Sequence, residues 1–191
     1  MPGHGPASLF SLALTAVLVW AGVYALPDGR LHLYFLDVGE GDAILIRSPG
    51  GRVILVDGGP DPLALTSHLG QILPFWQRRI DLLIATHADR DHLAGLIPLV
   101  QRYRVGRAME PPAMGHSPLS EEWHRALADK GVPLSLAYRG TVIDMGSGMR
   151  LEVLHPPKAA HNVAEIDDNR SSVVVRVIMG CCRVLLTADI D

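Results

Sequence analysis

The chain of 191 residues is poor in cysteine and in aromatic residues. Its only cysteines are the neighbours Cys181 and Cys182, so the sequence offers neither a CxxC metal motif nor a disulfide framework. We expect both to be buried in a strand, because they lie within a long apolar run. Aromatic residues form 5% of the chain without a clustered stripe, which argues against a stacking platform for single-stranded DNA.

The chain also lacks a strong charge of either sign. A net charge of −3 gives no global attraction for nucleic acid or anionic lipid, so either partner would need a local patch. The basic clusters at residues 78–79 and 102–107 are interpreted as solvated surface. No nucleophilic-serine elbow, phosphate-binding loop or dinucleotide fingerprint occurs. The 48% of hydrophobic residues nevertheless suffice to bury one globular core.

One long uncharged segment stands at the N-terminus. Residues 7–26 would span the ~30 Å hydrocarbon core of a bilayer as a helix, with Trp20 and Tyr24 near one interface. We therefore predict a transmembrane helix or signal anchor in residues 1–30. A cleaved signal peptide is the alternative, although no Lys or Arg precedes the segment. The arginines that follow the segment favour a cytoplasmic domain.

Residues 31–191 have the pattern of one layered α/β or α+β domain. Helical spacing of leucines predicts a helix over residues 62–76, and Pro98 should kink or shorten a later helix. A surface helix is expected from the N-cap Ser120 to Gly131. Short apolar runs between turn residues predict strands at 31–38, 42–48, 52–57, 80–87, 141–146, 149–156 and in the stretch 171–191.

The stretch IATHADRDHLAGL places two histidines and two aspartates within six residues, just after a predicted buried strand. His87, Asp89 and Asp91 alternate along an extended loop and can converge on one side, while His92 begins a helix. Imidazoles and carboxylates are ligands that zinc and first-row metals accept. The alternative is a polar loop whose aspartates cap the next helix. The density of ligand types favours a metal site.

The same stretch resembles the HxHxDH signature of the metallo-β-lactamase superfamily. The upstream residues 57–59, Asp-Gly-Gly, are similar to the Asp-Gly motif of that fold. The resemblance implies an αββα sandwich over residues 31–191. Further segments resemble, in order, the extracytoplasmic domain of ComEC-type DNA-uptake proteins, namely residues 35–46, 153–157, 169–177 and 185–190.

The resemblance also implies a centre of two divalent metal ions, zinc or manganese. His87 and Asp89 would bind one metal, and Asp91 and His92 the other. Asp189 matches the carboxylate that bridges both metals. Asp91 and Asp189 are therefore the expected catalytic residues as well as ligands.

Residues around these ligands are given supporting roles. Asp42 and Asp57 match positions that hold the ligands from below through hydrogen bonds. Ala188 stands where the family has glycine, and Glu40 where it usually has glutamine. His155 is interpreted as structural, because no ligand spacing surrounds it. The histidines without any partner pattern are expected at the surface, namely His68, His116, His124 and His161.

The ligand set suits an in-line displacement at a phosphodiester. The leading hypothesis is a metal-dependent hydrolase acting on DNA during DNA uptake, at the plasma membrane and beside a transport channel. The resemblance implies an extracytoplasmic domain, in contrast to the arginine distribution. One alternative is a hydrolase of the same fold acting on a small ester, lactone or thioester. Another is a non-catalytic module that binds single-stranded DNA beside a channel.

The sequence ends two residues after Asp189. The resembling family continues there with further elements and a histidine in a His-His-Gly-Ser motif, which completes the shell of the second metal. We therefore expect a sandwich that is incomplete at its C-terminus, poor in metal and weakly active.

Overall fold

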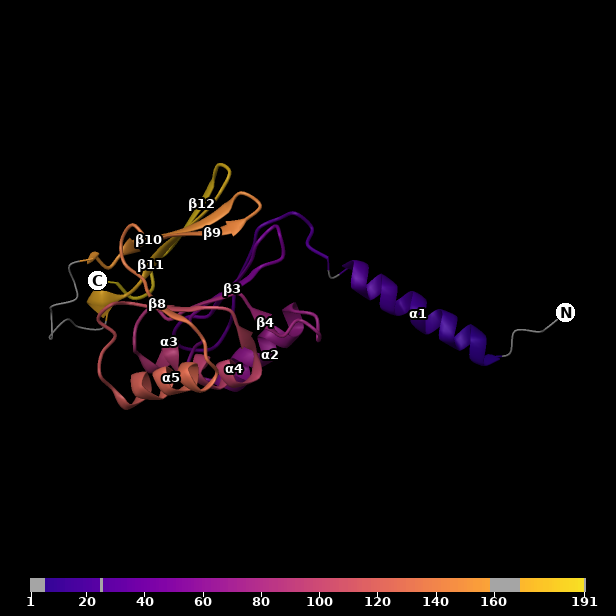
Figure 1. Ribbon diagram of the computed structural model, residues 1–191, viewed down its shortest axis with the longest axis horizontal. Coiled ribbons are helices and arrows are strands. Elements are labelled where there is room, and N and C mark those ends of the chain that lie inside the picture. Colours follow the sequence, from indigo (N-terminus) through magenta and orange to yellow (C-terminus); the bar gives the residue numbers. More distant parts are fainter. Residues whose placement is uncertain (1–5, 25, 159–168, 191) are drawn as a thin grey trace.

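The computed structural model describes residues 6–24, 26–158 and 169–190. Beyond the N-terminal helix α1 (Pro6–Tyr24), three layers follow one another: helices, a large sheet and a small sheet (Figure 1). The helices are α2 (Pro62–Ile72), α3 (Arg90–Leu93), α4 (Leu96–Arg102) and α5 (Pro118–Asp129). The predicted layered α/β class is confirmed.

The large sheet has six strands, in the order β1 (His32–Phe35), β2 (Ile44–Arg47), β3 (Val53–Val56), β5 (Leu82–Ile84), β7 (Ala108–Glu110) and β8 (Leu134–Leu136). The small sheet has the order β12 (Cys182–Leu186), β11 (Val174–Met179), β10 (Met149–His155) and β9 (Val142–Gly146). Two further strands pair separately, β4 (Arg79–Ile80) and β6 (Arg104–Val105), and a 3₁₀ turn, η2 (Asn169–Ser171), precedes β11.

Strands β3, β5, β7 and β8 run parallel, whereas β1, β2 and β3 pair antiparallel. The register joins Ile54 to Leu82, Leu83 to Ala108, and Ala108 to Leu134. The carboxyl ends of four strands therefore lie along one edge of the sheet. The connection that leaves β5 at this edge and the helix α3 that follows it carry four of the five predicted ligands, and the supporting residue Asp57 follows β3.

The large sheet separates two hydrophobic cores. In β2 and β3 the side chains alternate: Leu45 and Leu55 enter the core beneath the helices, and Ile46 and Ile54 enter the core between the sheets. Trp123 of α5 is fully buried in the helix-side core. Burial of each such side chain contributes about 1.5–3 kcal/mol, so both faces of the sheet hold the fold together.

Helix α5 begins earlier than predicted. Its N-cap is Ser117, whose hydroxyl accepts from the backbone N–H of Ser120, while the Ser120 hydroxyl accepts from the backbone N–H of Ser117. Both serines are suitable caps, but Pro118 directly after Ser117 favours the earlier start because proline suits the first helical position. Pro98 lies within the first turn of α4, where its missing N–H leaves no helical hydrogen bond unmade.

The N-terminal helix stands apart from the three layers (Figure 1). Nearly all of its described side chains are exposed, and large apolar ones among them include Leu9, Phe10 and Leu12. In the part of the chain that the structure describes, no helix is both long and apolar enough to cross a membrane. The expected transmembrane helix within residues 1–30 is therefore not supported.

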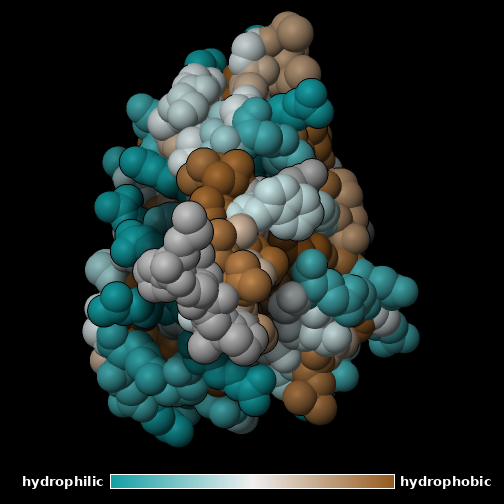
Figure 2. Space-filling model, turned by 90° about the vertical axis from the view of Figure 1, so that its right-hand side faces the viewer, coloured by the Kyte–Doolittle hydropathy of each residue, from teal (hydrophilic) through white to brown (hydrophobic). Residues whose placement is uncertain are grey.

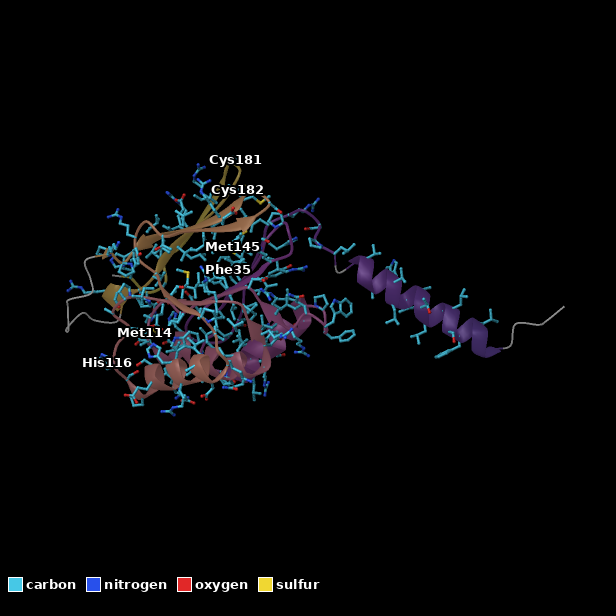
Figure 3. The ribbon with its side chains drawn as sticks, viewed as in Figure 1. Phe35, Met114, His116, Met145, Cys181 and Cys182 are labelled. Carbon is cyan, nitrogen blue, oxygen red and sulfur yellow. The ribbon has the colours of Figure 1, made fainter. Side chains whose placement is uncertain are left out.

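The prediction of buried cysteines was wrong. Cys181 and Cys182 are both exposed, at the end of the hairpin that joins β11 to β12 (Figure 3). Gly180 has a φ of +57° and turns the chain directly after β11. The apolar run is therefore two strands rather than one, and the thiols fall at the solvent-facing turn.

Candidate metal centre

The candidate ligands leave the large sheet where β5 ends. Residues 85–89 connect β5 to α3 with a bend at residues 87–88, and His87 lies in this connection while His92 lies in the helix. Both imidazoles are fully buried, whereas the side chains of Asp89 and Asp91 are partly open to solvent. The histidines are thus held inside the protein, and the carboxylates of Asp89 and Asp91 lie closer to solvent.

The structure brings three of the five predicted ligands, His87, His92 and Asp189, into one cluster and places Asp89 and Asp91 each beside one of the histidines. Nε2 of His87 lies 3.6 Å from Oδ2 of Asp89, and Nε2 of His92 lies 3.7 Å from Oδ2 of Asp91. Asp189, from the loop after β12, places Oδ2 3.3 Å from Nε2 of His92. One ligand atom each of His87, His92 and Asp189 lies within 4.8 Å of the others. Residues distant in sequence therefore form one cluster.

The inner nitrogen atoms of the cluster have no hydrogen-bond partner. Nε2 of His87 and Nε2 of His92 are both buried, and no described residue donates to or accepts from either atom. A polar atom buried without a partner costs about 1–3 kcal/mol unless something else satisfies it. Two such nitrogens beside the partly exposed carboxylate of Asp189 fit a divalent metal.

Asp57 organises the histidines from beneath. It follows β3 with a φ of +56° and is buried. Its carboxylate accepts hydrogen bonds from the backbone N–H of Thr86 at 2.8 Å, from the Thr86 hydroxyl at 2.6 Å and from Nδ1 of His92 at 2.9 Å. The second nitrogen of His92, Nε2, is consequently left to face the cluster.

Thr86 sets the tautomer of the neighbouring histidine. Its hydroxyl lies 2.6 Å from Asp57 and 2.9 Å from Nδ1 of His87. A carboxylate only accepts, so the single hydroxyl proton goes to Asp57 and Nδ1 of His87 donates to the hydroxyl oxygen. In the neutral tautomer that this arrangement selects, Nε2 of His87 is the nitrogen that can bind a metal. Sequence reasoning missed Thr86, although it directly precedes His87.

The charges in the cluster shift two pKa values. Burial opposes protonation of His92, but its hydrogen bond to Asp57 and the negative charges of Asp57, Asp189 and Asp91 raise the pKa of His92 to about 9. Burial and the neighbouring charge of Asp57 raise the pKa of Asp42. Asp42 also accepts, through its backbone carbonyl, the N–H of Gly59 at 2.9 Å.

Glycines let the loops of the site touch. A Cβ added at Gly41 would lie 1.9 Å from the backbone oxygen of Asp91, and one at Gly95 would lie 2.0 Å from the oxygen of Gly58. The backbone N–H of Gly58 donates to the carbonyl of His92 at 2.8 Å. These contacts hold the loop after β3 against the helix that carries His92.

His155, Ala188 and Glu40, which the sequence also singled out, lie in the described part of the chain. Nδ1 of His155 lies 3.1 Å from the backbone oxygen of Ser172, which agrees with a structural role. The next N–H, that of Val173, donates to the carbonyl of Thr86 at 2.9 Å and links the small sheet to the site. Ala188 has a φ of +47°, a conformation that glycine adopts more easily. Glu40 is exposed.

Of the histidines expected at the surface, His124 is exposed and His68 is half-buried, and both have polar partners. Nε2 of His68 lies 2.8 Å from the backbone oxygen of Asp37, and Nε2 of His124 lies 2.9 Å from the buried carboxylate of Glu110. Their partners come from other elements, so sequence spacing could not reveal them. His116 is exposed as expected (Figure 3), and His161 lies outside the described residues.

The fold and the cluster define a protein of the layered α/β class with a candidate His/Asp metal site, whose histidines follow the carboxyl end of the parallel strand β5. Residues 36–191 match the family model of the metallo-beta-lactamase superfamily, and the chain belongs to that superfamily.

The chain is similar to two competence proteins. It is 29% identical over 187 residues to ComE operon protein 3 of Bacillus subtilis (strain 168), covering 88% of this chain and 23% of that protein. It is 28% identical over 181 residues to competence protein ComA of Neisseria gonorrhoeae, covering 92% of this chain and 23% of that protein. The resemblance to ComEC-type proteins is thus confirmed, and the chain spans about a quarter of the length of these relatives.

A solved structure shares the fold. Zinc-bound PqqB from Methylobacterium extorquens superposes with a TM-score of 0.54 at 19% identity, covering 88% of this chain and 56% of that one. At this identity the likeness concerns the fold.

Proposed function

We propose that this protein is a metal-dependent hydrolase that cleaves DNA phosphodiesters during DNA uptake. The observation that carries the proposal is the pair of buried nitrogens without a hydrogen bond, Nε2 of His87 and Nε2 of His92, beside the carboxylate of Asp189. The competence relatives support DNA uptake as the process and a place at the plasma membrane. An extracytoplasmic position beside a transport channel is part of the same proposal.

Five residues would hold two metal ions. His87 and Asp89 would bind one ion, Asp91 and His92 the other, and Asp189 would contact both. Two zinc or manganese ions supply an activated water near neutral pH and stabilise the entering and leaving oxygens of a displacement. Three carboxylates against two imidazoles make the site hard enough to admit manganese.

The protein's own residues orient and expose this centre. The Asp57 carboxylate and the Thr86 hydroxyl fix the rings of His92 and His87 with their Nε2 atoms turned inward. The side chains of Asp91 and Asp189 are 38% and 47% exposed. The reacting edge is therefore open to solvent, which suits a polymeric substrate that cannot enter a closed pocket.

The test combines metal analysis with hydrolysis. The wild-type chain and Asp91→Ala are loaded with zinc or manganese, their metal content is measured, and single-stranded DNA, double-stranded DNA and a generic ester are supplied. Asp129→Ala, at the exposed end of α5, is the matched control. We expect metal-dependent DNA cleavage that Asp91→Ala abolishes and Asp129→Ala leaves unchanged.

Each other outcome has a defined meaning. Cleavage of the ester alone would replace DNA with a small-molecule substrate. Tight DNA binding without any hydrolysis by metal-loaded protein would favour a guiding module. Wild-type turnover by Asp91→Ala in metal-replete buffer would contradict the metal-centre assignment itself.

A further inference from the structure

The amino ends of the parallel strands carry a second group of charged residues. Arg52 precedes β3, Arg79 lies in β4 just before β5, and Arg107 precedes β7. Arg47 ends β2 opposite the first residue of β3, so it lies at the same edge. Because the candidate ligands from His87 to His92 follow the carboxyl end of β5, these four arginines mark the opposite side of the domain.

Two aromatic rings project beside them. The backbone N–H of Gln77 donates to the carbonyl of Pro74 at 2.8 Å and closes a turn after the buried Leu73. This turn presents Phe75 and Trp76, which are 74% and 47% exposed and meet edge to face with centroids 4.7 Å apart. Two adjacent exposed rings indicate a surface that contacts something apolar. We call Arg47, Arg52, Phe75, Trp76, Arg79 and Arg107 the arginine face.

The arginine face is hollowed between its cations. A cavity of about 370 Å³ opens between the two sheets and is lined by Arg52, Arg79 and Arg107. Two carboxylates also line the cavity. Asp81 accepts from Nε of Arg79 at 2.7 Å and from the backbone N–H of Val53, and Asp144 accepts from the backbone N–H of Gly146 at 2.7 Å. Among the described residues, Arg107 has no ion-pair partner. The donors left over suit phosphate oxygens, which guanidinium groups bind in a forked geometry.

The apolar N-terminal helix joins the domain on the same side. Pro27, just beyond α1, packs so closely on Gly51 that a Cβ there would lie 2.6 Å from its ring. Pro27 also lines a second hollow of about 170 Å³ together with Arg47 and Trp76. Figure 2 views the molecule from the end at which α1 lies in Figure 1, and hydrophobic residues are visible there among hydrophilic ones. The segment that follows the C-terminal end of α1 thus adjoins the arginine face.

We propose that the arginine face seats the domain on an anionic lipid bilayer. The Phe75 and Trp76 rings enter the headgroup region, and the arginines contact lipid phosphates, because amphipathic rings and cations both favour that interface. This inference goes beyond the proposed hydrolase function. It sets an orientation in which the metal centre opens away from the membrane.

Vesicle binding tests the contact with matched variants. The full chain is titrated with phosphatidylcholine vesicles that either contain or lack phosphatidylglycerol. Arg107→Gln should weaken binding to the anionic vesicles about fivefold, as expected for one basic residue at such a surface. Phe75→Ser should weaken binding more than Arg107→Gln does. The controls are Arg125→Gln, exposed on α5, and Phe35→Ser, 68% exposed on β1, and both should bind as wild type.

Fluorescence then locates the face at the membrane. In a Trp20→Phe background the remaining tryptophans are Trp76 and the fully buried Trp123. Brominated lipid should quench the Trp76 emission, and adding Trp76→Phe should remove the quenched component. If α1 alone causes binding, Trp76 stays unquenched and Arg107→Gln binds normally, which overturns the proposal. Loss of oligonucleotide binding in Arg107→Gln, with vesicle binding intact, would likewise overturn it in favour of nucleic acid.

Discussion

The carboxylate of Asp57 accepts a hydrogen bond from Nδ1 of His92 at 2.9 Å, with both side chains fully buried. This contact joins the end of β3 to the helix that carries one candidate ligand. A second pair of bonds from Thr86 to the same carboxylate extends it to His87. The four residues form one buried network, and its integrity decides where both Nε2 atoms point.

Removing the central carboxylate should destabilise the whole protein. Asp57→Ala leaves three buried donors, on Thr86 and His92, without an acceptor. Loss of one partner from a buried charged contact costs about 3 kcal/mol or more in the free energy of unfolding. Urea denaturation measures the loss. Asp129→Ala, an exposed carboxylate, should change stability by less than about 0.5 kcal/mol; equal effects of the two variants would contradict the network.

The stability of the metal-free protein should fall at alkaline pH. The pKa of His92 is raised from 6.5 to about 9 on folding, so the folded state binds the proton more tightly. Its contribution to stability is complete below pH 6.5 and is lost as the pH rises through about 9. Urea denaturation across this range in the presence of chelator measures the change. His92→Gln should remove this component, whereas His116→Gln should retain it.

Zinc binding should release a proton for the same reason. At neutral pH the metal-free His92 is protonated, and a metal must displace that proton from Nε2. Because zinc must displace the proton of His92, we expect the apparent affinity for zinc to rise about tenfold per pH unit below pH 9. Calorimetric titrations in buffers of different ionisation enthalpy count the protons released. Release unaffected by His92→Gln would exclude His92 as the source.

Metal removal should lower the melting temperature. Zinc at a hundredfold excess over its dissociation constant stabilises the folded state by about 2.7 kcal/mol if the unfolded chain does not bind it. In a chain of this size that corresponds to about 5–10 °C. Thermal scans with zinc and with chelator measure the shift. Calcium, which lacks affinity for imidazole, serves as the control ion.

Two glycines at positive φ provide a matched pair near the site. Gly39 and Gly41 have φ values of +88° and +74°, so alanine strains either backbone similarly. Only at Gly41 would the new Cβ collide with the backbone of Asp91; nothing lies within 4 Å at Gly39. Gly41→Ala should therefore weaken zinc binding at least about tenfold, and Gly39→Ala should not. Competition with a chromophoric chelator gives both affinities, and equal affinities would show that the contact does not position Asp91.

Local pattern was enough to predict most of the strands. The apolar runs before residues 48 and 57 became β2 and β3, because both faces of the large sheet are covered and each residue has a core to enter. Pattern failed at Cys181 and Cys182, since an apolar run does not reveal a hairpin turn inside it. It also misplaced the start of α5, where two serines compete for the cap.

Local sequence pattern likewise predicts only part of the candidate site. The ligands between His87 and His92 are neighbours in sequence, and their spacing alone indicated a metal. Asp189 reaches His92 only because β12 returns the chain to the same edge, so its place depended on resemblance until the fold was known. The role of Thr86 depends on the direction of one hydroxyl proton, which no sequence pattern encodes.

Strand β3 is a partition between two interiors. Leu55 faces the helices, Ile54 and Val56 face the small sheet, and Asp57 comes next in the chain. Close-packed interiors transmit a displacement instead of absorbing it. An enlarged side chain on either side of the partition therefore moves the carboxylate that orients His92. The chemistry at the edge of the sheet responds to volume in both cores, and a compensating reduction on the opposite side can restore it.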